Sequence, residues 1–136
     1  MTYYWIIPGN LKIFRITDYF SNNDIVDWKQ SHYKFSVGDI VFLYVSSPIS
    51  SIRYMLEVLK TDIPFEESIK DGEYWTNEHP VAEEVRSYKY VRLKLLKKSD
   101  SPALHIDALS KIGIKAPQGA TRRFTFEQID YILKHF

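Results

Sequence analysis

The part of the sequence that decides the fold is Val37-Gly38-Asp39-Ile40-Val41-Phe42-Leu43-Tyr44-Val45-Ser46. A turn at Gly38-Asp39 opens this stretch, and the uninterrupted apolar run that follows is typical of a buried β-strand. Ser46-Ser47-Pro48 ends the run, and the partly alternating residues 52–59 predict a second strand paired with the first. The centre of the chain is therefore expected to be a sheet.

The remaining elements surround this centre. Residues 3–7 and 89–96 predict two more strands, and residues 25–33 look loop-like because neither the strand period nor the helix period fits them. Helices are expected loosely at 11–20, at 102–112, and after Thr125, which forms a capping box with Gln128. Residues 65–84 are interpreted as a surface insertion with one short helix near 65–70. We predict a single α+β domain over 1–136, with a small curved or barrel-like mixed sheet and flanking helices.

Charge is distributed unevenly along a chain whose formal net charge is only +1. Residues 57–84 carry nine acidic and two basic side chains, a local net charge of −7, whereas residues 86–123 carry ten basic and two acidic ones, a local net charge of +8. The low net charge of the whole chain argues against a general polyanion binder. The asymmetry between segments nevertheless indicates a charged partner for the basic part.

Several classes of protein are disfavoured. The absence of cysteine excludes disulfides and thiol chemistry, and fits a cytoplasmic protein. No apolar stretch approaches a membrane span, so we expect no membrane partner. The four histidines are scattered, and neither a glycine-rich phosphate loop nor metal-ligand spacing is present. We therefore expect no catalytic residue, no metal and no cofactor, and a protein that is not an enzyme.

Two short segments suit binding. In Trp28-Lys29-Gln30-Ser31 a large ring stands beside a cation, an amide and a hydroxyl. A tryptophan that plugs one end of a small barrel is an equally good reading of the same segment. Ser46 and Ser47 end a buried strand, where their hydroxyls would face any pocket at that end of the sheet, although as turn formers they are ordinary.

The loop near the C-terminal end is basic and contains a glycine. Its candidate phosphate contacts are Lys115, Gln118, Gly119, Arg122 and Arg123. Cationic side chains together with close backbone approach suit contact with a nucleic-acid backbone. A basic loop that only improves solubility is the alternative.

The order of these motifs resembles the EVE domain, a member of the PUA-like superfamily related to the YTH readers of methylated RNA. The resemblance rests on Tyr4-Trp5-Ile6-Ile7 as first strand, on Trp28-Lys29, on the stretch from Gly38 to Ser46, and on Ile52 through Val58. It runs over residues 3–63 and more weakly over 90–96 and 116–131. It implies a barrel of five or six strands with a pocket for a flipped, modified base.

The resemblance also implies roles for individual residues. Trp28 matches the family's tryptophan that stacks on the base, Ser46 closes the strand at the pocket, and Asn10 lies near a position of polar base contacts. Trp75 has no family counterpart and is a candidate second wall. Such domains occur alone or fused to HNH nucleases and other components of modification-dependent restriction systems, so a nuclease or restriction component is an implied partner.

Two departures from the family pattern bear on specificity. The family loop has Gly-Val-Arg-Asn soon after the tryptophan, whereas this chain has Lys29-Gln30-Ser31-His32, which leaves the identity of the base open. The sister ASCH group is disfavoured because its Gly-x-Lys-x-x-Glu-x-Arg string is missing. The sequence therefore predicts a non-catalytic reader of a methylated base in DNA. Alternatives are a reader of modified RNA, or a module that binds a small ligand or a protein through the same pocket.

Overall fold

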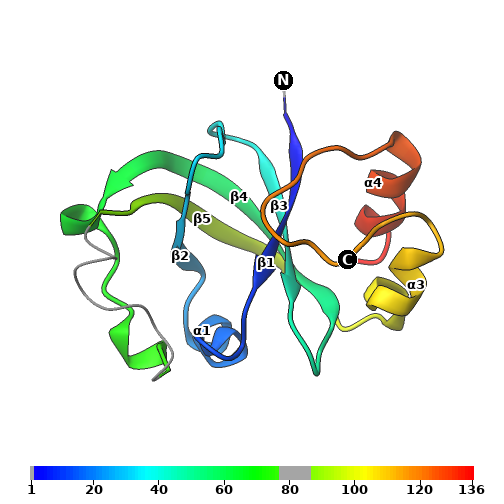
Figure 1. Ribbon diagram of the computed structural model, residues 1–136, viewed down its shortest axis with the longest axis horizontal. Coiled ribbons are helices and arrows are strands. Elements are labelled where there is room, and N and C mark those ends of the chain that lie inside the picture. The colour runs from blue at the N-terminus through cyan, green and yellow to red at the C-terminus, as the bar shows by residue number, and fades with distance from the viewer. Residues whose placement is uncertain (1, 77–86) are drawn as a thin grey trace.

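The computed structural model describes residues 2–76 and 87–136. Within that part of the chain, one sheet contains β1 (Tyr4–Gly9), β2 (Ile25–Lys29), β3 (Ile40–Val45), β4 (Ser51–Pro64) and β5 (Lys89–Lys98). The strand order is β1-β3-β4-β5-β2, in which β1 and β3 run parallel and the other neighbours run antiparallel (Figure 1). The predicted α+β class with a small mixed sheet is confirmed.

The sheet curves so that its two edge strands come close together. The register of β4 against β5 shifts at three places and that of β3 against β4 at one, and such irregularities bend and twist strands. A Cβ on Gly9 at the end of β1 would lie 3.5 Å from Cη2 of Trp28 on β2. The first and last strands of the sheet therefore meet at Gly9 and Trp28, as in a partly closed barrel.

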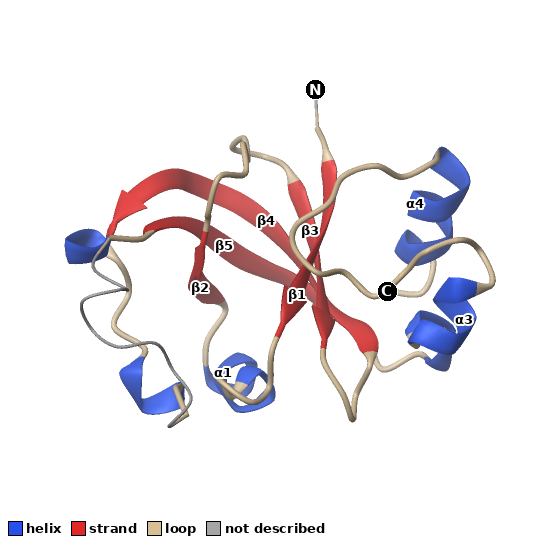
Figure 2. Ribbon diagram, viewed as in Figure 1, coloured by secondary structure: helices blue, strands red, loops and turns tan. Residues whose placement is uncertain are grey.

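Among the described residues, three helices flank the sheet: α1 (Ile16–Asn22), α3 (Ile106–Ser110) and α4 (Phe126–Leu133). The same residues contain three short 3₁₀ turns: η1 (Phe65–Glu67) and η2 (Gly72–Tyr74) lie between β4 and β5, and η3 (Pro102–Leu104) lies between β5 and α3. Figure 2 shows α3 and α4 together on one side of the sheet, away from α1 and β2. The capping box of Thr125 and Gln128 is confirmed. Among the described helices, none has the length and apolar character that crossing a bilayer requires.

The element boundaries differ from the predicted ones in several places. The predicted loop 25–33 begins with β2, whose residues 26–29 alternate between apolar and polar although Val26 and Asp27 are both buried. The predicted helix 102–112 is divided into η3 and α3, and the loosely predicted helix 11–20 begins only at Ile16. Strand β4 continues to Pro64, beyond the predicted end at residue 59. Part of the insertion predicted at 65–84 lies outside the described residues.

Both faces of β1 and β3 are buried, each in its own core. Trp5, Val41 and Leu43 belong to the cluster inside the curve of the sheet. Ile6 and Phe42 belong to a second cluster, which includes residues of α3 and α4. This explains why residues 40–45 are apolar without alternation, since neither face meets water.

Asp39 fixes the beginning of β3 against β1. Its carboxylate accepts hydrogen bonds from the backbone N–H of Tyr3 (3.1 Å), the indole N–H of Trp5 (3.0 Å) and the backbone N–H of Ser36 (2.9 Å). Gly38 before it has φ of +92°, a conformation that favours glycine. The Gly-Asp pair is thus a structural anchor that sets the register of the two parallel strands.

Candidate functional site

A cavity of about 680 Å³ lies where the edge strands meet. It is bounded by the ends of β1, β2 and β3, by the loop after β1 and by the start of β5. The loop at Pro117 and Gln118 and the described end of the acidic segment (residues 57–84) complete its boundary. Among the described residues, its aromatic lining is Phe14, Trp28, Tyr44, Trp75, Tyr88 and Tyr90. A pocket with this many rings is suited to a flat, partly apolar ligand.

Phe14 is the centre of the aromatic wall. Its buried ring lies 5.9 Å from the Trp28 ring at 90° and 4.7 Å from the Trp75 ring at 53° between planes. Both tryptophans are half-buried and both line the cavity. The structure thus brings together Trp28 and Trp75, which are far apart in the sequence.

The acidic segment holds Trp75 in place through the loop after β1. Phe14 and Trp75 form an isolated β-bridge, and the backbone N–H of Thr76 donates to the carbonyl of Ile13 (3.0 Å). The indole N–H of Trp75 donates to Oδ1 of Asp71 (2.7 Å). The segment from 71 to 76 is therefore a wall of the cavity, a role that its composition did not predict.

Asn10 and Ser46 shape the loop after β1 and also line the cavity. Oδ1 of Asn10 accepts from the backbone N–H of Lys12 (2.9 Å), and Oγ of Ser46 accepts from that of Leu11 (3.0 Å). The backbone N–H of Ser46 donates to the carbonyl of Gly9 (2.9 Å). Among the described residues, nothing accepts from the Asn10 side-chain amide or the Ser46 hydroxyl, so both can donate to a ligand.

The predicted base-binding residues are only partly brought together. Lys29 and Ser47 line the cavity with those above, whereas Gln30 and Ser31 do not. Gln30 is 5% exposed, accepts from the backbone N–H of Asp62 (2.7 Å) and donates to its carboxylate (3.1 Å). Strand β2 ends at Lys29 and the chain turns, with φ of 57° at Ser31, so these two side chains point elsewhere.

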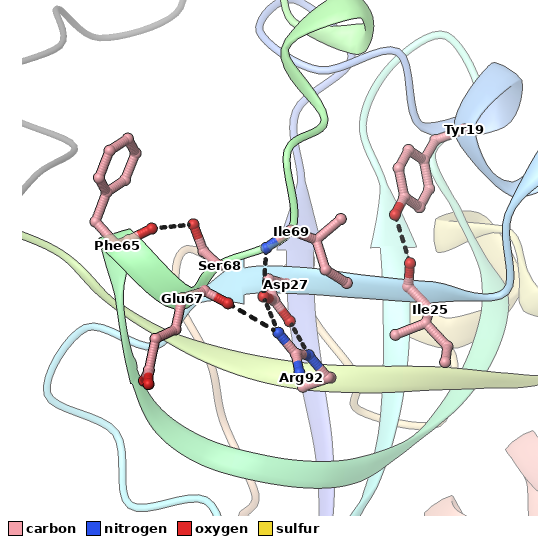
Figure 3. A network of polar contacts seen from close by, with 8 residues as sticks. All are labelled: Tyr19, Ile25, Asp27, Phe65, Glu67, Ser68, Ile69 and Arg92. Carbon is pink, nitrogen blue, oxygen red and sulfur yellow. Dashed lines mark hydrogen bonds and ion pairs between the residues drawn. The ribbon is translucent and has the colours of Figure 1, made fainter.

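Two carboxylates, Asp27 and Asp71, also line the cavity, and sequence analysis predicted neither. Asp27 is paired with Arg92, which lies opposite it on β5, through Nε–Oδ1 (2.8 Å) and Nη2–Oδ2 (2.9 Å) bonds (Figure 3). Oδ2 also accepts from the backbone N–H of Ile69 (2.8 Å), and Nη2 of Arg92 donates to the carbonyl of Glu67 (3.2 Å). The hydrogen bond to Asp27 raises the pKa of Arg92. This pair therefore joins β2, β5 and the acidic segment.

Burial, reinforced by Asp71, raises the pKa of both Tyr19 and Tyr90 to about 12. Because the folded-state pKa lies above the ordinary value of 10.0, the stability that these groups contribute is complete below pH 10 and is lost as pH rises towards 12. We expect the phenolate absorbance of two of the ten tyrosines to appear only near pH 12, together with falling stability. A single titration of all tyrosines near pH 10 in the folded protein would contradict this.

The predicted phosphate-binding residues divide into two groups. Lys115, Gln118, Gly119 and Arg123 line a second cavity of about 370 Å³, and Gln118 lines the first cavity as well. The Arg122 guanidinium instead lies over the rings of Tyr3 (4.2 Å) and Trp5 (5.2 Å). In the described part of the chain, no group of acidic and histidine side chains is arranged to hold a metal ion.

Sequence reasoning missed much of the aromatic and charged lining of the first cavity. The missed residues are Lys12, Phe14, Asp27, Tyr44, Asp71, Tyr88 and Tyr90. Lys12 and Phe14 lie in the predicted helix 11–20, Asp27 lies in the predicted loop 25–33, and the others lie in or beside predicted strands and the insertion. Only the curvature of the sheet places them together. No local pattern could have identified them.

The similarity to solved structures shows a PUA-like fold. Solved structures that share it include the protein PSPTO5229 from Pseudomonas syringae (TM-score 0.65, 16% identity, covering 96% of this chain and 97% of that one). An ASCH protein from Zymomonas mobilis (TM-score 0.62, 14% identity, covering 96% and 94%) is also similar. So is human THYN1 in complex with DNA containing 5-methylcytosine (TM-score 0.62, 12% identity, covering 98% and 96%).

No protein-family model and no curated protein sequence matches the chain. At 12–16% identity the solved structures share only the fold, which the EVE and ASCH groups have in common. The PUA-like fold is confirmed, and the assignment to the EVE group stays a prediction.

Proposed function

We propose that this protein is an EVE-type, non-catalytic reader of a methylated base in DNA, which enters the first cavity flipped out of its strand. The observation that carries the proposal is the pair Trp28 and Trp75, which flank Phe14 in one cavity beside a basic loop. A base needs flat faces on which to stack, and Trp28 and Trp75 offer two.

The free energy that base flipping costs and the free energy that stacking returns are comparable. Flipping a base out of a duplex costs about a few kcal/mol, and stacking on an aromatic side chain returns about 1–3 kcal/mol. Burying one methyl group adds about 0.8 kcal/mol. Since this last contribution is small, we expect Asn10 and Ser46, with their available donors, to supply part of the selectivity.

Human THYN1, which shares the fold, has been solved with DNA containing 5-methylcytosine, and this makes methylcytosine the first base to test. The implied nuclease or restriction partner stays a prediction from the EVE resemblance. Modified RNA, or a small ligand in the same cavity, would be recognised by the same rings, so each is an outcome of the test below.

The test is a binding panel with the full chain at two salt concentrations. It compares duplex and single-stranded DNA and RNA that carry 5-methylcytosine, N6-methyladenine or no modification. We expect a methylated DNA to bind most tightly, binding to weaken as salt rises because phosphates are neutralised, and every oligonucleotide to be recovered intact. Equal, weak binding of all probes at low salt would refute the proposal. Cleavage of any probe would refute its non-catalytic part.

One double variant distinguishes a nucleic-acid ligand from a small ligand. Arg122→Glu combined with Arg123→Glu should reduce the binding of an oligonucleotide strongly, because both lie in the basic loop. A free nucleoside has no phosphate for these two arginines to contact. Unchanged oligonucleotide binding in the double variant would favour the small-ligand alternative.

A further inference from the structure

The second cavity adjoins the first one. It is lined by the loop from Gly113 to Thr121, by Tyr33 and by three residues at the beginning of α4 and just before it. Pro117 and Gln118 line both cavities, so a single loop forms the wall between them. A ligand that fills the first cavity can therefore reach the second across this wall.

The two cavities differ in charge. Lys115 and Arg123 line the second, both are exposed, and no acidic side chain lines it among the described residues. Neither cation has an ion pair within the part of the chain that the structure describes. The first cavity, by contrast, is lined by two acidic side chains, Asp27 and Asp71, and by two basic ones, Lys12 and Lys29, and Asp27 is already paired with Arg92. A phosphate is thus attracted more strongly to the second cavity, whose charged lining among the described residues is entirely basic.

The loop between the cavities also offers backbone donors. Residues 115–120 contain five N–H groups, since Pro117 has none, and within the described residues none of the five donates a hydrogen bond. Successive N–H groups of this kind, next to cations, are suited to bind an anion. The cavity therefore has a basic lining, and the loop that forms one side of it has N–H groups that are not used within the described part of the fold.

The loop is held at both ends and in the middle, so these donors are in fixed positions. The N–H of Ile114 donates to the carbonyl of Leu109 (3.0 Å), and Thr121 exchanges two hydrogen bonds with Ile6 (2.8 and 3.0 Å). A Cβ on Gly119 would lie 2.2 Å from the hydroxyl oxygen of Tyr33. The backbone therefore packs directly on Tyr33, which only glycine permits.

We propose that the second cavity binds the phosphate of the nucleotide whose base occupies the first cavity, with Lys115 and Arg123 as its cationic ligands. This inference rests on the proposed function. The unit recognised is then a modified nucleotide with one flanking phosphate, and its sugar lies across Pro117 and Gln118. Arg122, held over Tyr3 and Trp5, takes no part in this contact.

The experiment uses the full chain and single-stranded oligonucleotides with one central 5-methylcytosine. In two probes a neutral methylphosphonate replaces the phosphate on the 3′ or the 5′ side of that base. We expect one of the two replacements to weaken binding about tenfold, as the loss of a charge-assisted contact does. In the double variant Lys115→Gln with Arg123→Gln, replacing that phosphate with a methylphosphonate should not weaken binding further. Lys111→Gln, at an exposed lysine that lines neither cavity, is the matched control and should keep the full difference between the phosphate and methylphosphonate probes.

The outcomes distinguish this inference from the function on which it rests. If methylated DNA binds in a Trp28-dependent way but neither methylphosphonate changes its affinity, the phosphate site is refuted and the reader stands. A difference that persists in the double variant also refutes the assignment of Lys115 and Arg123. If methylated and plain probes bind alike throughout, both proposals fail. Gly119→Ala must displace Tyr33 or the loop, and it is a second test variant. In this variant the phosphate and methylphosphonate probes should bind with equal affinity.

Discussion

Replacing Trp28 with alanine is expected to weaken binding of a methylated oligonucleotide by about 5- to 150-fold, the equivalent of about 1–3 kcal/mol of stacking. Trp28 is half-buried, lines the first cavity and packs edge-on against Phe14 (5.9 Å). Its removal takes away one of the two tryptophan walls and leaves the phosphate contacts intact. The loss should therefore be much larger for methylated than for unmodified DNA, as a fluorescence-anisotropy titration of both probes would measure.

Two control variants separate stacking from general damage. Trp28→Phe keeps a ring at the same position and should retain most of the preference for the methylated probe. Phe126→Ala removes an aromatic ring that is 89% exposed on α4 and does not line the cavity, so binding should not change. Because Trp28 also contacts the core, its variants are compared at a temperature where circular dichroism shows them folded. An equal loss for both probes in Trp28→Ala would mean that the ring does not read the base.

Local patterns were sufficient for the elements at the centre of the fold. The run from Ile40 to Val45 predicted β3 because both of its faces are buried, and Thr125 with Gln128 predicted the beginning of α4 because a capping box is local. Strand β2 was missed because it is short. Its residues 26–29 alternate between apolar and polar, but the polar residues 30–32 that follow do not continue the pattern.

The candidate site could be predicted only in part, since it is made of contacts between distant segments. The EVE resemblance indicated Trp28 and Ser46, and both line the cavity. Trp75 was carried only as a candidate second wall, because its place depends on a bridge to Phe14. Gln30 and Ser31 follow Lys29 directly, and nothing in the sequence marks the turn that directs them away.

Arg92→Met is expected to lower the free energy of unfolding by about 3–5 kcal/mol, the usual cost of leaving a buried charge without its partner. The Asp27 side chain is 1% exposed, whereas that of Arg92 is 27% exposed. Without Arg92, the carboxylate keeps only the N–H of Ile69 as a donor among the described residues, and its 1% exposure leaves it little contact with water. Asp27→Leu should cost less, because the guanidinium left behind can reach water. Urea unfolding of both variants measures this asymmetry.

The double variant Asp27→Leu with Arg92→Met tests the physical cause. Replacing both members of a buried ion pair with apolar side chains is often close to neutral, so we expect the double variant to recover most of the stability lost in Arg92→Met. Because Asp27 precedes Trp28 on β2, Arg92→Met should also weaken binding of the methylated probe, and the double variant should restore part of it. Additive losses would show that the pair acts through something other than the burial of the Asp27 charge. Equal losses in the two single variants would show that hydration of Arg92 does not matter.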